Sequence, residues 1–302
     1  MVCFCALFFA GVSSDAADSR LENLSSRSLV GTGSDTLITG FVIGGSAPKE
    51  ILIRAVGPSL SKLGITNALA HPRMELFNSA GQSVASNDQW GPALSAAFTQ
   101  VGAWQLPENS LDAALRVTLA PGAYSVQVSG VENGRGMVLV EVYEMDQTSR
   151  LLNLSTRTRI ETGDGLLISG LVVGGTGTRR VLIRAGGPAL SAYGVDGTLR
   201  DPLLTVFDRK GMVIARSDNW DEDGQAAEID SAGEQVGAAP FASGSKDAAA
   251  IVELEAGVYS IHVTGVGGTT GVALLEVFDV TDTVLNVRYS DEALNWTGAA
   301  VS

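Results

Sequence analysis

The chain has 302 residues, of which 45% are hydrophobic and 18% charged, and it contains 36 glycines. A chain of this length suggests about two domains and can bury a substantial core. The formal net charge of −13 argues against a nucleic-acid-binding protein, because phosphates require basic surfaces. Such an acidic balance suits an extracellular surface that stays soluble by self-repulsion.

The first predicted element is a signal peptide over residues 1–17. An apolar run from Val2 to Val12 is followed by small residues spaced as in a cleavage site. The run is too short to span a bilayer, and the missing basic region indicates a shortened start. The alternative is a partly buried N-terminal strand. Both cysteines, Cys3 and Cys5, lie here, so we expect a mature chain without disulfides.

The rest of the chain is a tandem repeat. "RLENLSSRSLVGTGSDTLITGFVIGG" from Arg20 aligns with "RLLNLSTRTRIETGDGLLISGLVVGG" from Arg150 at an offset of 130. A five-residue insertion changes the offset to 135 for "LDAALRVTLAPGAYSVQVSG" and "KDAAAIVELEAGVYSIHVTG". We therefore expect one domain over residues 18–147, a second over 148–281, and a tail over 282–302.

Within each copy, short apolar or alternating runs separated by turn signals predict strands. "TLITGFVIGG", "EILIRAVG" and "GMVLVEVYE" are examples. Helix is expected only near residues 94–101 and 226–236. The pattern predicts an all-β fold of two tandem β-sandwich, jelly-roll-like domains. The expected hairpin loops are 78–81 and 208–211, with a second pair at 120–122 and 255–257.

Four strings carry a family resemblance: "LIRAVGPSL", "ELFNSAGQSVASNDQW", "LDAALRVTLAPGAYSVQVSG" and "VLVEVYE". Together they resemble a tandem β-sandwich repeat of large secreted and surface-anchored bacterial proteins. More loosely, the chain is similar to the β-sandwich modules appended to secreted bacterial peptidases, which share the pattern L-x-x-G-x-Y-x-V-x-V-x-G. The resemblance covers nearly all of both copies. It implies an extracellular, non-catalytic role and brings no catalytic residues and no ligand.

Each copy sets one arginine and one glutamate in apolar strands. Arg54 lies in "EILIRAV" and Glu141 in "MVLVEVY", and the second copy repeats them as Arg184 and Glu276. We expect two structural ion pairs, Arg54–Glu141 and Arg184–Glu276, because buried charges normally have a satisfied partner. The functional alternative is an arginine clamp for an acidic ligand.

Residues suited to catalysis are scarce. His71 and His262 occupy different positions in the two copies, and neither a G-x-S-x-G elbow nor a phosphate-binding loop is present. Zinc would need clusters of Cys or His that the mature chain lacks. We therefore expect no enzyme and no required cofactor.

One acidic segment has the spacing of a calcium loop. "NWDEDGQAAEID" places Asn219, Asp221, Asp223 and Asp230 at positions 1, 3, 5 and 12, with Gly at position 6. The first copy has "QWGPALSAAFTQ" there and lacks these ligands. Calcium binding is one hypothesis, and a solvated acidic loop is the other.

The tail contains "VLNVRYS", which resembles "RLENLSS" and "RLLNLST" at the start of the two copies. It is therefore similar to the first strand of a third repeat, with apolar Leu285, Val287 and Tyr289. Such a strand either folds back onto the second copy or adds to an exposed sheet edge of another molecule. We hypothesise the second arrangement, which joins molecules head to tail into a filament.

The sequence favours a secreted, non-catalytic structural or adhesive protein of the bacterial surface. Its expected partners are copies of itself, other surface proteins or polysaccharide, with no nucleic acid and no membrane span. The rival hypothesis is an extracellular carbohydrate-binding module. In that protein Trp90 and Trp220 would stack on sugars, whereas in a structural protein they pack into a core.

Overall fold

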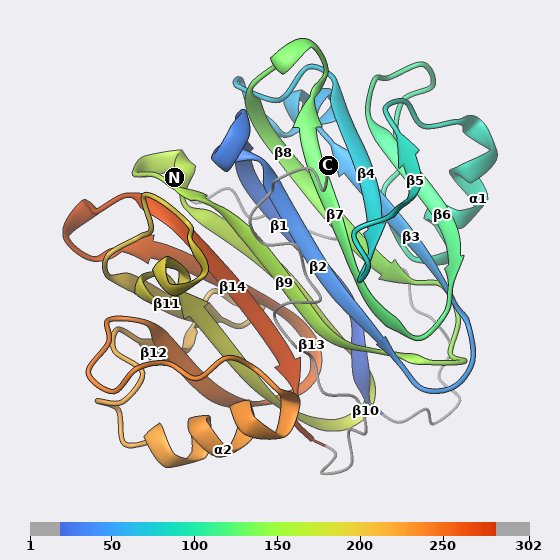
Figure 1. Ribbon diagram of the computed structural model, residues 1–302. Coiled ribbons are helices and arrows are strands. Elements are labelled where there is room, and N and C mark those ends of the chain that lie inside the picture. Colours follow the sequence, from blue (N-terminus) through green and yellow to red (C-terminus); the bar gives the residue numbers. More distant parts are fainter. Residues whose placement is uncertain (1–18, 282–302) are drawn as a thin grey trace.

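The computed structural model describes residues 19–281, which form an all-β fold (Figure 1). The predicted signal peptide and the assembly strand with Leu285, Val287 and Tyr289 lie outside these residues. The strands of the first copy are β1 (Arg20–Val30), β2 (Leu37–Gly44), β3 (Lys49–Val56), β4 (Pro72–Asn78), β5 (Ser83–Asn87), β6 (Ala113–Leu119), β7 (Gly122–Gly130) and β8 (Gly136–Glu144). Those of the second copy are β9 (Arg150–Ile160), β10 (Leu167–Gly186), β11 (Pro202–Phe207), β12 (Val213–Ser217), β13 (Ala248–Gly265) and β14 (Gly271–Asp279).

Helix is confined to short segments. Both expected α-helices are present, α1 (Ser95–Gln100) and α2 (Ala226–Val236). No helix within residues 19–281 is long and apolar enough to cross a membrane. The 3-10 helices are η1 (Gly33–Asp35), η2 (Pro58–Leu63), η3 (Pro92–Leu94), η4 (Val131–Asn133), η5 (Gly163–Gly165), η6 (Pro188–Tyr193) and η7 (Val266–Gly268).

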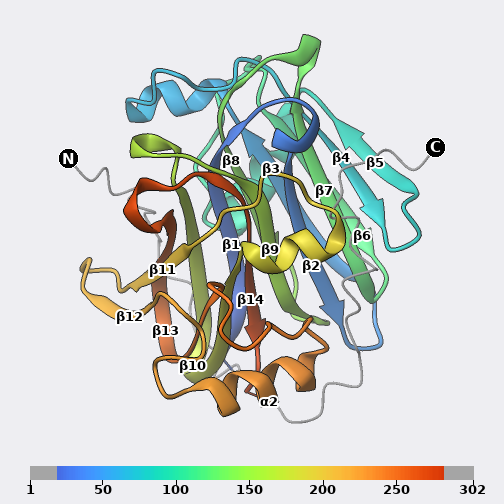
Figure 2. The same cartoon turned by 60° about the vertical axis from the view of Figure 1, so that its left-hand side comes forward.

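The two copies exchange their first strands. β1 lies between β8 of its own copy and β10 of the second copy, where Ser25 is opposite Gly170. In the same way β9 lies between β14 and β2 of the first copy, where Ser155 is opposite Gly40. The strand order is therefore β5-β4-β7-β2-β9-β14-β10 on one side and β10-β1-β8-β3-β6 on the other, with β13, β11 and β12 continuing from β10. Figures 1 and 2 show β1 and β9 side by side at the centre of the molecule.

The expectation of two separate sandwich domains, 18–147 and 148–281, is wrong. The order from β5 to β6 alternates between the copies, because β9, β14 and β10 of the second copy lie between β2 and β1 of the first. Apolar periodicity identifies a strand and its buried face, but it does not identify the neighbouring strands. β1 and β9 have closely similar sequences, so each fits the slot beside the second strand of either copy.

The hairpin loops at 78–81 and 208–211 are confirmed, since β4 pairs with β5 and β11 with β12. The hairpins at 120–122 and 255–257 are wrong. β6 pairs with β3, whereas β7 pairs with β2 and β4, so residues 120–122 form a corner between two parts of the sheet. In the second copy β13 runs through this corner without interruption.

One hydrophobic core serves both copies. Leu24 and Phe41 of the first copy and Leu154 and Leu171 of the second belong to the same buried cluster. Because strand side chains alternate between faces, the same strands also present apolar residues outward. α1 covers the outward face around β3 and β8, and α2 covers that around β10, β13 and β14. The two helices lie at opposite sides of the molecule (Figure 1).

A polar seam crosses this core where β1 meets β9. Ser26 Oγ and Thr156 Oγ1 lie 2.6 Å apart, and the hydroxyls of Ser28 and Thr158 also share a hydrogen bond. Each pair joins residues that correspond between the copies at the offset of 130. The equivalent strands therefore contact each other around an approximate two-fold relation.

Candidate functional site

Both ion pairs that the sequence predicts are present. Arg54 on β3 is opposite Glu141 on β8, and the Arg54 Nε atom lies 3.0 Å from Glu141 Oε2. Arg184 on β10 is opposite Glu276 on β14, and the Arg184 Nη1 atom lies 3.1 Å from Glu276 Oε2. Both arginines point away from the shared core, because the alternate residues of their strands supply that core.

Aromatic side chains from the α1 segment cover the first pair. Arg54 Cζ lies 4.7 Å from the ring centroid of Phe98 and 5.4 Å from that of Trp104. Arg54 Nη1 donates a hydrogen bond to the Trp104 carbonyl oxygen at 2.8 Å, and the Tyr143 hydroxyl donates to Glu141 Oε1 at 2.6 Å. These contacts offset the cost of burying the guanidinium. Sequence reasoning missed Phe98 and Trp104, because their segment has no strand periodicity.

The second pair has a different cover. Arg184 Cζ lies 4.0 Å from the ring centroid of Phe241, and its Nη2 donates to the carbonyl oxygen of Ala239. Phe241 comes from the segment after α2, just as Trp104 follows α1. In both copies the arginine thus links three elements: its own strand, the strand of the glutamate, and the helical segment outside. This arrangement agrees with the structural interpretation of the two arginines.

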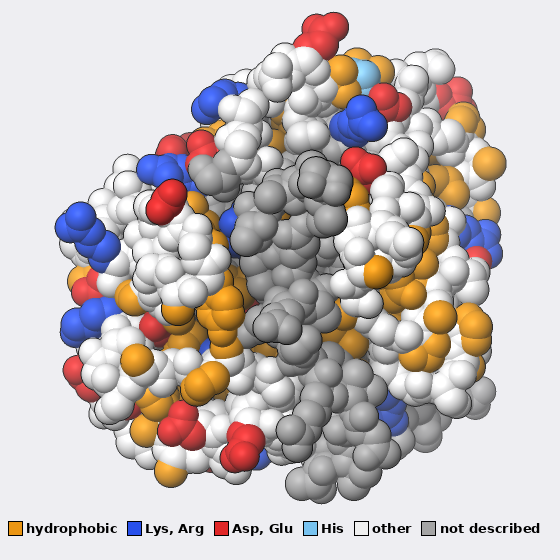
Figure 3. Space-filling view, viewed as in Figure 1, with side chains coloured by type: hydrophobic (Ala, Val, Ile, Leu, Met, Phe, Trp, Pro, Cys, Tyr) orange, Lys and Arg blue, Asp and Glu red, His pale blue; other side chains and the backbone are white. Residues whose placement is uncertain are grey.

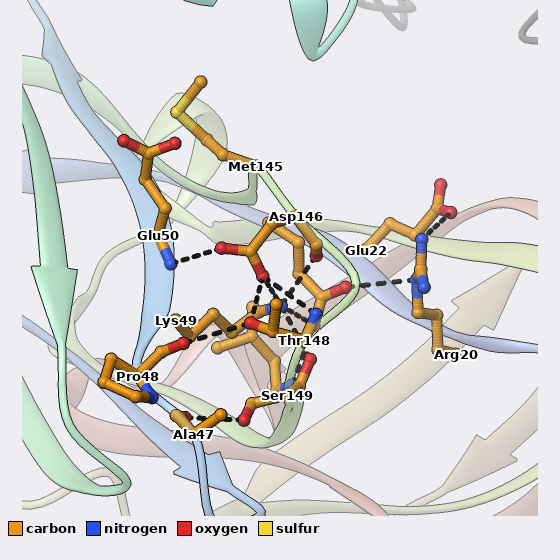
Figure 4. A network of polar contacts seen from close by, with 12 residues as sticks. Arg20, Glu22, Ala47, Pro48, Lys49, Glu50, Met145, Asp146, Thr148 and Ser149 are labelled. Carbon is orange, nitrogen blue, oxygen red and sulfur yellow. Dashed lines mark hydrogen bonds and ion pairs between the residues drawn. The ribbon is translucent and has the colours of Figure 1, made fainter.

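A buried lysine holds the junction between the copies (Figure 4). The Lys49 side chain has no exposed surface, and its Nζ donates to the carbonyl oxygens of Asp146 and Ser149 at 2.8 and 2.7 Å. Nζ also lies 3.3 Å from Glu144 Oε1, and Arg20 Nε lies 3.1 Å from Glu144 Oε2. The start of β3, the end of β8 and the start of β1 are therefore joined at one point.

Burial determines the direction in which the pKa of Glu144 shifts. Desolvation raises the pKa of Glu144 to about 7, although Lys49 and Arg20 act in the opposite direction. In the second copy the equivalent contact is Arg179 Nη1 to Asp279 Oδ2, at 3.5 Å. Sequence reasoning missed both contacts. The repeat alignment could have predicted them. The offset of 130 aligns Lys49 with Arg179, and the offset of 135 aligns Glu144 with Asp279, so each copy has a cation and an acid at the same two positions.

A buried aspartate in each copy fixes the turn that follows the arginine strand. Asp112 Oδ1 accepts hydrogen bonds from the backbone N–H groups of Gly57 and Ser59, at 2.8 and 3.3 Å. Asp247 Oδ1 accepts from the N–H of Gly187 at 2.7 Å and from that of Ala189. Both carboxylates are fully buried and bind the first N–H groups of η2 and η6, which have no partner inside those helices. The "GPSL" and "GPAL" stretches are therefore structural turns.

The two tryptophans pack into the core, as the structural interpretation predicts. Trp90 and Trp220 are each 4% exposed. Their indole N–H groups donate to the carbonyl oxygens of Pro107 and Ala242, at 3.1 and 3.2 Å. Neither ring is available as a platform for stacking on a sugar.

The acidic segment shows no assembled cation site. Among residues 19–281, no group of three or more His, Cys, Asp or Glu side chains is placed to hold a metal ion. Asp221 Oδ2 accepts a hydrogen bond from the N–H of Gly244 at 2.7 Å, and Asp230 belongs to α2. Calcium binding by Asn219, Asp221, Asp223 and Asp230 stays a prediction, which thermal melts in chelator and in millimolar calcium test.

Comparison with known proteins gives no family for this chain. No family model and no curated protein matches it. Among solved structures it is similar to the crystal structure of the infectious bursal disease virus VP2 subviral particle. That likeness has a TM-score of 0.16 and 9% sequence identity, over 95% of this chain and 77% of the viral chain. A TM-score this low supports no statement about fold or function.

Proposed function

We propose that this chain is a secreted, non-catalytic structural or adhesive protein of the bacterial surface, whose copies associate head to tail through strand addition. The observation that carries the proposal is the edge strand β12. In the described residues β12 forms a sheet ladder only with β11, although the Ser217 Oγ atom at its end also accepts a hydrogen bond from the Ala249 N–H of β13. Met212, Val213 and Ile214 are 64%, 54% and 40% exposed, and hydrophobic side chains reach the surface on this side of the molecule (Figure 3).

An unpaired apolar edge is a template for another strand, because its free N–H and C=O groups need partners. Consecutive side chains of a strand point to opposite faces of the sheet, so one of two neighbours is usually buried. In β12, however, the consecutive apolar residues Val213 and Ile214 are both exposed. The equivalent edge strand of the first copy, β5, exposes Val84 but begins with Ser83. The second copy therefore carries the more apolar edge.

The pairing of β1 and β9 supports an exchanged strand. Each of them begins a repeat, and each pairs with a strand of the other copy. A third segment of this kind, 284–290, lies outside the described residues, and the slots beside β2 and β10 are already filled by β9 and β1. We infer that segment 284–290 pairs with β12 of another molecule.

Three buried charged residues of the first copy have roles that fit a scaffold. The buried charged groups Arg54, Lys49 and Asp112 all bind backbone or carboxylate groups of neighbouring elements. The carbohydrate-binding alternative receives no support from Trp90 and Trp220, which are buried.

Light scattering and electron microscopy test the proposal. The full chain is expected to assemble with rising concentration, and deletion of residues 282–302 is expected to abolish assembly. Ile214→Lys places a charge on the β12 edge and is expected to reduce assembly strongly. Val84→Lys, at the equivalent position of β5, is the matched control and is expected to assemble normally. Assembly of the truncated chain, or a full chain that stays monomeric, would contradict the proposal.

A further inference from the structure

A cavity of about 880 Å³ lies beside Arg184, between η6, Trp220 and the α2 segment. This volume falls within the range of small-molecule sites. Tyr193, Asp230 and Glu234 line the cavity and are exposed to solvent, so it opens to the surface. The rest of the lining is largely apolar, with Ile229, Ala238 and Phe241 among its residues.

The first copy fills the corresponding space with its own side chains. "VGAW" at 101–104 aligns with "VGAA" at 236–239 at the offset of 135, which places Trp104 opposite Ala239 and Phe98 opposite Gly233. The hydrogen bonds confirm the alignment, because Arg54 donates to the Trp104 carbonyl oxygen and Arg184 to that of Ala239.

The two rings that contact Arg54 are thus replaced by a methyl group and a hydrogen atom in the second copy. Gly233 and Ala239 both line the cavity. A Cβ atom at Gly233 would meet no other atom within 4 Å, so the space beside this helix residue is open.

Phe241 takes the place of only one of the two first-copy rings, that of Phe98. It contacts Arg184, and its ring centroid lies 6.3 Å from that of Trp220, as Phe98 lies 5.3 Å from Trp90. Trp104, which gives Arg54 its second aromatic contact, has no replacement. The second copy therefore retains the guanidinium and one ring, and it lacks the indole.

We propose that the cavity binds a small aromatic amine, with its ring in the place that Trp104 fills in the first copy and its ammonium group at Asp230 and Glu234. A ring beside Arg184 gains guanidinium–ring and apolar contacts. The charge of Arg184 is already matched by Glu276, so the two acids at the rim determine the charge preference. The net charge of −13 also favours a cationic ligand over an anionic one. This site is independent of the proposed strand addition.

Calorimetric titration of the full chain with tryptamine, indole and indole-3-acetate tests the site. Tryptamine is expected to bind one site, about tenfold or more tighter than indole, with indole-3-acetate weakest. Asp230→Asn combined with Glu234→Gln is expected to remove the preference for the amine and to leave indole binding unchanged. No binding of any probe at millimolar concentration would overturn the proposal. Tighter binding of indole-3-acetate would overturn the assignment of an amine.

Two tryptophan variants separate the cavity from other surfaces. Ala239→Trp restores the residue of the first copy and is expected to abolish binding while the circular dichroism spectrum stays that of the parent. Trp104→Ala opens the equivalent space beside Arg54 and is expected to add a second indole site. Unchanged binding in a folded Ala239→Trp chain would overturn the proposal. If the Ala239→Trp chain does not fold, the Trp104→Ala chain decides: binding of only one indole per chain in that variant would overturn the proposal.

Discussion

Arg54 has no exposed surface, and Glu141 is its carboxylate partner at 3.0 Å. Glu141→Gln leaves the guanidinium buried without a countercharge, so we expect the free energy of unfolding to fall by about 3–5 kcal/mol. Urea denaturation measures this loss. Glu276→Gln is the matched variant, and a smaller loss is expected because Arg184 borders a cavity that water can enter. Equal and negligible losses in both variants would show that the pairs do not stabilise the fold.

Glu144 makes stability depend on pH near neutrality. Its pKa is raised from 4.5 to about 7, so the folded chain holds a proton that the unfolded chain has already released. Since the folded state binds more protons between these values, the unfolding free energy falls as pH rises through this window. We expect a loss of about 1 kcal/mol or more between pH 5 and pH 7. Glu144→Gln is expected to flatten this slope, and an unchanged slope would place the effect on another group.

At the scale of elements, local pattern predicts strands well and strand partners poorly. The Arg–Glu pairs were predictable because one lone charge of each sign stands in a strand of each copy. The exchange of β1 and β9 was not, since the two strands are similar in sequence and have the same apolar pattern. The contacts of Phe98 and Trp104 with Arg54 could not be predicted either, because these residues come from a segment whose path depends on tertiary contacts.

The exchange of first strands can be tested with a cross-link. Ser26 and Thr156 lie in different copies, and their hydroxyl oxygens are 2.6 Å apart, which brings their Cβ atoms close to disulfide distance. Residues 19–281 contain no cysteine, so with Cys3 and Cys5 replaced by serine, Ser26→Cys with Thr156→Cys is expected to form one disulfide under oxidation. Non-reducing electrophoresis after proteolysis between the copies detects it. Val84→Cys with Ile214→Cys, on the edge strands β5 and β12, is the control that should stay reduced. Free thiols in the first pair would argue for separate copies.

At the scale of the whole molecule, the interlocked strands predict a single cooperative unit. Leu24 and Phe41 share their core with Leu154 and Leu171, so neither copy has a complete core of its own. When the other copy is absent, β2 keeps β7 but loses β9, and the first half of β10 keeps β13 but loses β1. Fragments 19–147 and 148–281 are therefore expected to be unfolded alone and to regain strand structure when mixed.

Tryptophan fluorescence follows each copy within the intact chain. Trp90 and Trp104 report on the first copy and Trp220 on the second. In a Trp296→Phe background, a Trp220→Phe chain and a chain with Trp90→Phe and Trp104→Phe therefore follow opposite halves. In a chain that unfolds in two states, each variant is expected to show a transition that coincides with the loss of its own circular dichroism signal. Destabilising the first copy with Leu24→Ala is then expected to move the Trp220 transition to lower denaturant, by about 2–5 kcal/mol in unfolding free energy. Independent copies would leave the Trp220 transition where it was, because a cavity in the first copy lowers the stability of the second only if the two unfold together.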